Sequence, residues 1–341
     1  MIKYSSAILF LSLFCLVSTS TDYYNLSYPD YFPDTAYDFD KSPLSATQIN
    51  LGRALFYDPI LSKDSTISCA SCHSPYNAFA HTDHDLSHGI NDKIGTRNAP
   101  ALFNLAWQKS FMWDGAINHL DMQSLAPISH PDEMGEDIKN VVIKLQRKKI
   151  YPLLFEKAFG DTLITGEYIL KSLAQFQLTL VSANAKYDAV KNGETEFTAQ
   201  EKNGYELYKK NCSSCHTEPL FSTYEFANNG LPVDTTLNDF GKIKITQFPT
   251  DSLLFKIPSL RNLSFTAPYM HDGRFRKLKN VIKHYNDNIQ NHPTLSPQLE
   301  KSPNFSVSEQ TDLITFLRTL NDKEFVFNKD NKYPIEIFHI N

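Results

Sequence analysis

Two short stretches of the sequence combine residue types at a spacing that can do chemistry. They are Cys69-Ala70-Ser71-Cys72-His73 and Cys212-Ser213-Ser214-Cys215-His216, and they contain four of the five cysteines of the chain. In a C-x-x-C-H motif the two thiols can form thioether bonds to one haem, and the adjacent histidine can bind its iron. Cys69, Cys72, Cys212 and Cys215 are therefore predicted to attach two haem c groups, with His73 and His216 as proximal iron ligands.

A zinc knuckle and a redox-active dithiol are the alternative interpretations of C-x-x-C. Zinc would need further cysteines or suitably spaced histidines, and a thioredoxin-like motif would need a βαβ context. Neither surrounds these motifs, and the motif occurs twice, so two covalently bound haems remain the prediction.

The length of 341 residues predicts about two domains of ordinary size, and 41% hydrophobic residues are enough to build their cores. The net charge of −5 with mixed signs gives no indication of a nucleic-acid partner.

Residues 1–20 have the pattern of a signal peptide. Lys3 gives a positive start, Ala7 to Val17 is apolar, and Ser18-Thr19-Ser20 supplies small residues for cleavage. The apolar stretch is short for a membrane span. Export to the periplasm is therefore expected, which suits c-type haem because this haem is attached outside the bacterial cytoplasm. A lipid anchor at Cys15 is the alternative, and the bulky Phe14 before it disfavours that interpretation.

The elements that must position the two motifs are predicted to be helices. Residues 21–44 lack a period and are expected to be an extended tether. The N-terminal domain, 45–190, should begin with a helix from Ser45 that Asp58-Pro59 ends, and further helices are expected at about 137–149 and 167–184. The irregular segment 74–135 is expected to be functional.

The second unit, 195–322, repeats the first, and 323–341 is predicted as a C-terminal tail. Leu51 to Phe56 before the first motif and Asn203 to Tyr208 before the second share glycine, aliphatic and aromatic positions. A last helix at about 307–320 has a capping box in Ser306 and Glu309 and should pack on the first helix of its unit. The predicted fold is mainly α, with two cytochrome c-like haem domains in tandem and few or no strands.

Over roughly 45–320 the sequence resembles the bacterial di-haem cytochrome c peroxidases, a family that also includes MauG. The resemblance rests on motifs that follow in family order: Arg97-Asn98-Ala99-Pro100, Trp113-Asp114-Gly115, Glu133-Met134-Gly135, Pro258 to Asn262 and Thr266 to Gly273.

The resemblance implies an enzyme that reduces hydrogen peroxide to water at the N-terminal haem. Electrons would come through the C-terminal haem from a small periplasmic redox protein, either a c-type cytochrome or a cupredoxin. MauG-like oxidation of a protein substrate and a di-haem electron carrier without catalysis are the alternatives. A homodimer is an assembly that this family often adopts.

The resemblance also implies roles for particular residues. Trp113 matches the tryptophan between the haems, and Gln123 and Glu133 match polar residues above the peroxidatic iron. A carboxylate there can move a proton between the two peroxide oxygens; a surface glutamate is the alternative. A calcium site between the domains is implied at Asn98, Thr266 and Pro268, the last two through backbone oxygen, and oxygen ligands suit calcium.

The resemblance also implies a sixth ligand for each iron, and alternatives remain for the second. His88 matches the detachable ligand of the first iron, whereas His81 and His84 are expected to face solvent, and His271 matches a histidine at the haem edge. Tyr285 stands where the peroxidases place methionine and MauG places tyrosine. A phenolate would lower the potential of the second haem. Met270, His284, or Tyr285 acting only as a packed aromatic are the alternatives.

Overall fold

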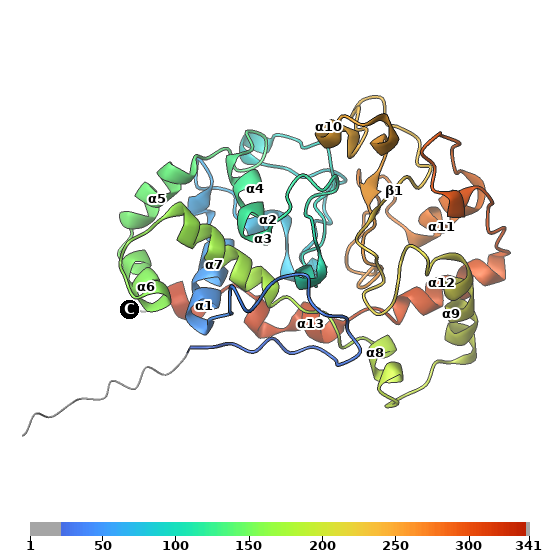
Figure 1. The fold of residues 1–341 in the computed structure, drawn as a ribbon, viewed down its shortest axis with the longest axis horizontal. Helices are drawn as coiled ribbons and strands as arrows, with labels where there is room; N and C mark the ends of the chain where they lie inside the picture. Colours follow the sequence, from blue (N-terminus) through green and yellow to red (C-terminus); the bar gives the residue numbers. More distant parts are fainter. Residues whose placement is uncertain (1–21, 339–341) are drawn as a thin grey trace, which may run out of the picture.

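The computed structural model describes residues 22–338, and the regular structure in that range is almost entirely helical (Figure 1). The predicted signal peptide, with Cys15, lies outside the described residues. One two-stranded antiparallel sheet joins β1 to β2, with Phe226 opposite Lys256. The prediction of a mainly α fold with few strands is therefore confirmed. The helices and strands are α1 Ala46–Tyr57, α2 Cys69–Cys72, α3 Leu120–Gln123, α4 Leu125–Ser129, α5 Ile138–Gln146, α6 Ile150–Phe159, α7 Gly166–Leu178, α8 Lys186–Lys191, α9 Ala199–Asn211, β1 Phe226–Ala227, α10 Ile243–Thr246, β2 Phe255–Lys256, α11 Leu278–Asp287, α12 Val307–Arg318, α13 Lys323–Phe327 and α14 Ile335–Phe338.

Two hydrophobic cores organise these helices. The first core takes its buried side chains mainly from residues 32–180, and the second takes them from residues 187–320. In Figure 1, α1 to α7 gather at the left and α9, α11 and α12 at the right, with α8 below and between the two groups. None of the helices within residues 22–338 is long and apolar enough to cross a membrane.

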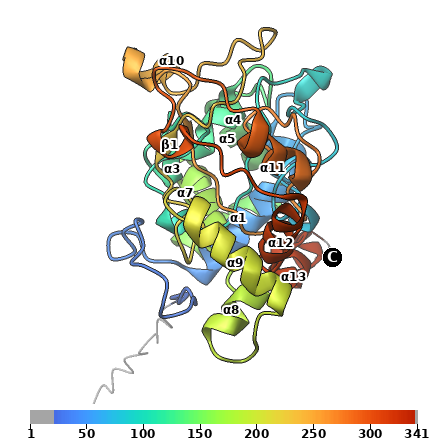
Figure 2. The same ribbon diagram turned by 90° about the vertical axis from the view of Figure 1, so that its right-hand side faces the viewer.

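The repeated glycine of the two units has the same structural reason in each. In the first unit α1 packs on α7, and a Cβ at Gly52 would lie 1.8 Å from the carbonyl oxygen of Ser172. In the second unit α9 packs on α12, and a Cβ at Gly204 would lie 2.0 Å from the carbonyl oxygen of Asp312. Only glycine allows two helices to approach this closely. Figure 2 shows α9 beside α12, the packing expected for the last helix.

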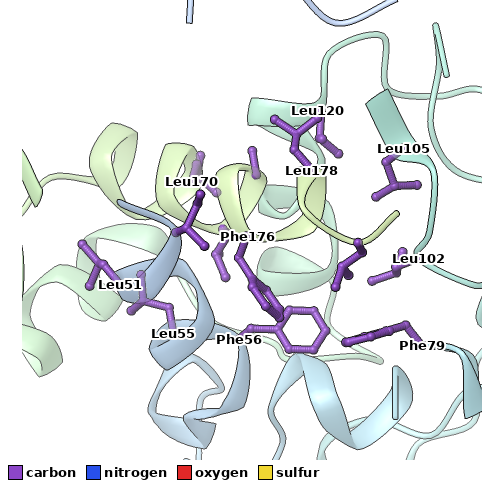
Figure 3. Close-up of a cluster of buried hydrophobic side chains, with 14 of the residues drawn as sticks. Leu51, Leu55, Phe56, Phe79, Leu102, Leu105, Leu120, Leu170, Phe176 and Leu178 are labelled. Atoms are coloured by element: carbon purple, nitrogen blue, oxygen red, sulfur yellow. The ribbon is translucent and has the colours of Figure 1, made fainter. Parts of the chain in front are cut away.

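Aromatic rings fill the centre of the first core (Figure 3). The ring of Phe56 on α1 lies 5.2 Å from that of Phe176 on α7 and 5.8 Å from that of Phe79, centroid to centroid. These edge-to-face contacts are favourable for aromatic pairs. Because Phe79 belongs to the loop after the first C-x-x-C-H motif, this cluster fixes the motif on the helix pair.

Some helices begin where the capping residues of the sequence predict, and one helix ends earlier than predicted. Ser45 accepts a hydrogen bond from the backbone of Gln48 at the start of α1, and the capping box of Ser306 and Glu309 is present at the start of α12. The helix predicted over 167–184 ends earlier, at Leu178. Beyond it the backbone carbonyl of Leu180 accepts a hydrogen bond from Asn104, so a distant loop draws the chain out of the helix.

Both terminal segments pack on the domains. The predicted tether is irregular over 22–44, but Tyr31 donates a hydrogen bond to Asp188 and Trp107 donates one to the carbonyl of Pro33. The segment predicted as a C-terminal tail forms α13 and α14 within its described part. Its Phe325 and Val326 are buried in the first core, which therefore includes side chains from the far end of the chain.

Candidate di-haem site

One cavity of about 810 Å³ lies between the two domains and reaches both C-x-x-C-H motifs. Its walls include every residue that the sequence nominated for haem attachment, catalysis, calcium binding or sixth ligation, His284 excepted. These are Cys69, Cys72, His73, His88, Asn98, Trp113, Gln123, Glu133, Cys212, Cys215, His216, Thr266, Pro268, Met270 and Tyr285.

The first motif presents a histidine that is ready to bind iron. Helix α2 spans Cys69–Cys72 and is capped by His73, whose backbone N–H closes the turn on the carbonyl of Cys69. The His73 Nδ1 lies 2.9 Å from the carbonyl oxygen of Phe79, which orients the ring and leaves Nε2 for a metal. Burial lowers the pKa of His73 to about 4, so the imidazole is neutral, as a ligand must be.

The second motif repeats this arrangement with other partners. It follows directly on α9, which Cys212 caps. The His216 Nδ1 lies 3.1 Å from the carbonyl oxygen of Pro258 and 3.3 Å from that of Phe221, and burial lowers the pKa of His216 to about 4. The cysteines of both motifs are free thiols. Two oriented imidazoles beside paired thiols in a shared cavity fit two haem c groups.

Glu133 lies in the loop between α4 and α5, where it is half-buried in the cavity wall. Burial raises the pKa of Glu133, with Asp132 adding to the shift and His130 opposing it. The pKa of Cys72 is raised to about 11, mainly by burial and further by the charge of Glu133. Glu133 and the first motif line the same cavity. On the same wall, the Gln123 amide lies 3.7 Å from Sδ of Met112.

Trp113 is held by both domains at once. Its Nε1 donates a hydrogen bond of 2.9 Å to the carbonyl of Asn98, and its own carbonyl accepts one of 2.8 Å from the backbone of Lys256. The next residue, Asp114, accepts from Arg97 at 2.6 Å, and the same guanidinium binds Asp239 of the C-terminal domain. The indole is thus fixed at the junction of the two domains.

Three histidines form a stack beside the first motif. The rings of His84 and His88 lie 4.1 Å apart and those of His81 and His84 lie 5.5 Å apart, centroid to centroid. His84 is exposed, as predicted, but the prediction for His81 is wrong because only 9% of it is accessible. Ring stacking on a neighbour, which sequence spacing does not reveal, buries it. His88 lines the cavity and pairs with Asp92 through Nδ1.

The candidates for sixth ligand of the second iron share one polar neighbour. The side-chain amide of Asn229 lies 3.5 Å from the Tyr285 hydroxyl and 3.6 Å from Sδ of Met270. Burial raises the pKa of Tyr285 to about 12, and the nearby Cys212 and Cys215 add to the shift while Asn229 opposes it. His284 instead turns its Nε2 to the carbonyl of Asn229 and is absent from the cavity wall formed by the described residues.

The three residues nominated for calcium line the same cavity. Asn98 donates through its side chain to the carbonyl of Asp85. Within residues 22–338 no hydrogen-bond donor reaches Oδ1 of Asn98 or the backbone oxygens of Thr266 and Pro268. These three oxygens are available to a hard cation, which is the chemistry that calcium prefers.

Sequence reasoning missed two features of the cavity wall, the guanidinium bridge from Arg97 to Asp239 and the buried Lys256. Most lysines are exposed, so a sequence gives no reason to expect a buried one. An ion pair between residues far apart in the chain leaves no local pattern either. The available signal was the position of Lys256, two residues before the Pro258 motif.

Comparison with known proteins agrees with this geometry. A family model described as di-haem cytochrome c peroxidase matches residues 46–196, and one described as cytochrome c matches residues 201–321. The chain is 37% identical to the methylamine utilization protein MauG of Methylophilus methylotrophus over 287 residues, which cover 82% of this chain and 84% of the relative. It is 32% identical to the cytochrome c peroxidase Ccp of Escherichia coli, covering 82% of this chain and 59% of that protein.

Among solved structures, a MauG-like protein associated with microbial copper homeostasis superposes with a TM-score of 0.82 at 30% identity, over 91% of this chain and 99% of the other. The two motifs, the shared cavity and these relatives lead to one conclusion: the chain belongs to the di-haem cytochrome c peroxidase family, which includes MauG.

Proposed function

We propose that this protein reduces hydrogen peroxide to water, using two electrons and two protons for each peroxide, with electrons from a small redox protein. The observation that carries the proposal is that Glu133, half-buried and with a raised pKa, lines the cavity that reaches both motifs. A carboxyl group whose pKa is raised holds its proton more readily and can act as acid and as base beside the iron site.

Each residue of the site has a separate role in this proposal. A haem bound at each motif supplies an iron that exchanges one electron at a time. Glu133 takes the proton from the near oxygen of peroxide and returns it to the far oxygen, which leaves as water. Gln123 orients the peroxide by hydrogen bonding. Trp113, held between the two domains, provides the path along which electrons pass from the second site to the first.

A second candidate function is MauG-like oxidation of a protein substrate. It is favoured by Tyr285, whose hydroxyl lies at the second site within reach of Asn229, because a phenolate ligand stabilises higher oxidation states of iron. In that case the two sites would share oxidising equivalents, and a partner protein would be the reductant.

Three further features complete the proposal. Asn98, Thr266 and Pro268 bind one calcium ion between the domains, supported by their available oxygens in the cavity wall. His88 serves as the detachable sixth ligand of the first iron, supported by its place in that wall. Residues 1–20 direct export to the periplasm, supported by their charge and apolar pattern.

The test is steady-state consumption of hydrogen peroxide by the haem-loaded protein, with a reduced c-type cytochrome and, separately, a reduced cupredoxin as donor. The proposal expects two donor molecules oxidised for each peroxide consumed, at a rate far above that of free haem. A rate equal to free haem with both donors would reject it. Turnover that requires a protein substrate in place of a donor would favour the MauG-like function.

A further inference from the structure

Lys256 is a buried cationic side chain in the wall of the cavity. It lies on β2, only 9% of it is accessible, and its backbone N–H is the group that holds the carbonyl of Trp113. Its Nζ donates to Oε1 of Gln108 at 3.2 Å and to the carbonyl of Ser110, and it lies 5.6 Å above the ring of Phe111. All of these partners are neutral, and no carboxylate among residues 22–338 binds the ammonium group directly.

The charged groups around Lys256 pair with other residues. Asp114 is the opposite charge that acts on it, but Asp114 accepts from Arg97 at 2.6 Å. On the paired strand β1, Phe226 is covered by Lys242, whose own partner is Asp251. On the other side, His271 stacks on Phe255 at 3.7 Å.

An ammonium group in this position is poorly compensated. Burial lowers the pKa of Lys256 to about 7, and the Asp114 charge opposes the shift only in part. Negative charge added to the cavity would favour the protonated amine, because two charges interact strongly where water is excluded. An electron arriving at an iron in the cavity is such a charge.

We propose that Lys256 is a redox-linked proton site of the haem pair. When one electron enters the pair from the donor, the neutral amine of Lys256 takes one proton from solvent and becomes an ammonium group. When the electron leaves, the proton returns to solvent. No other bond forms or breaks. The coupling is reciprocal, so protonation of Lys256 makes reduction easier by the same factor that reduction favours protonation.

This inference rests on the proposed two-haem function, and it gives that function a means of keeping the cavity near electrical neutrality. Peroxide reduction brings two electrons inward for each turnover. Uptake of a proton at Lys256 offsets the charge of one of them within the wall that also holds Trp113.

The experiment is a spectroelectrochemical titration of both haems in the haem-loaded protein from pH 5.5 to 9, with no peroxide present. For the wild type we expect the equilibrium constant for reduction to fall about tenfold between the acidic and alkaline limits, which is 59 mV for a one-electron couple. The change should centre near the pKa of Lys256.

Three variants make the assignment specific. Lys256→Met removes the charge and should hold the potential at its low, alkaline value across the range. Lys256→Arg keeps the charge at every pH, because guanidinium does not deprotonate, and should hold the potential at its high, acidic value. Lys202→Met, which changes an exposed lysine of α9, should match the wild type.

The pH dependence of unfolding provides an independent readout. Unfolded lysine binds a proton up to a pH near 10, whereas folded Lys256 has lost it above about 7. The unfolded state then binds more protons, so wild-type stability should rise with pH over this window. Lys256→Met should lose that rise.

Each outcome decides the matter. Undiminished pH dependence of the potentials in Lys256→Met would place the titrating group elsewhere and overturn the inference. Haem potentials that depend on pH through Lys256, in a protein that shows no peroxide turnover, would leave the Lys256 inference standing and reject the proposed function instead. If Lys256→Met fails to fold, a potential in Lys256→Arg that titrates like the wild type overturns the inference equally.

Discussion

Glu133 is the single residue on which the proposed chemistry depends most. The Glu133→Gln substitution keeps the shape and hydrogen bonding of the side chain but removes its capacity to hold and release a proton. We expect kcat for peroxide to fall about a hundredfold with both haems still attached, measured by steady-state kinetics and optical spectra. The matched control is Asp132→Asn, which removes the neighbouring charge and should keep most of the activity. Unchanged turnover in Glu133→Gln would make Glu133 a structural residue.

Tyr285 and Met270 lie at the same Asn229 amide, so two single-residue variants can tell which one binds the second iron. We expect Tyr285→Phe to alter the optical and EPR spectra of the C-terminal haem and to leave those of the N-terminal haem nearly intact. Met270→Leu should leave both unchanged, because Met270 would then only fill space at the haem. A methionine-to-iron charge-transfer band in the wild type, lost in Met270→Leu, would reverse the assignment.

The crossing of α9 and α12 is the element on which the second domain depends. A methyl group at Gly204 would meet the backbone oxygen of Asp312 at 2.0 Å, and a backbone atom cannot turn aside as a side chain does. We expect Gly204→Ala to lower the free energy of unfolding by about 3 kcal/mol, the upper part of the range for overpacking. Chemical denaturation of the haem-loaded protein measures it.

The control for this crossing lies on the exposed face of the same helix. Lys202→Ala adds no contact with α12 and should change the free energy of unfolding by less than about 0.5 kcal/mol. Equal effects of the two substitutions would mean that α9 does not pack on α12 as closely as the structure indicates.

The bridge from Arg97 to Asp239 acts on the molecule as a whole, because it ties the two domains together beside Trp113. Burial alone would raise the pKa of Asp239, but the hydrogen bonds and charge of Arg97 outweigh it and leave the pKa below its usual range. A carboxyl group with a lowered pKa stabilises the fold above about pH 4, and that contribution is lost as the pH falls further.

Asp239→Asn should therefore lower stability at pH 7 by about 3 kcal/mol, since it removes one of the two buried carboxylates that bind Arg97. Below pH 4 the gap between variant and wild type should narrow. Unfolding curves at several pH values measure both effects. A gap that stays constant down to pH 3 would show that the charge of Asp239 is not the source of the stability. Glu206→Gln, which affects an exposed pair on α9, is the control and should change little.

Local chemistry explains what the sequence by itself determined about this protein. The two C-x-x-C-H motifs predict covalent haem because attachment depends on residues within one turn of chain. Ser306 and Glu309 predict a helix start because a capping box closes over four residues. The mainly α fold follows from side-chain periodicity, and the glycine shared by the two units from duplication.

Only the tertiary structure decided which distant groups share an environment. It buried His81 by stacking, ended α7 at Leu178 through a contact with Asn104, and placed Phe325 in the first core. It also left Lys256, in the cavity wall, without a carboxylate partner among the described residues. Burial and electrostatics depend on atoms brought together from far apart in the chain, and these neighbours are absent from the local pattern that a sequence displays.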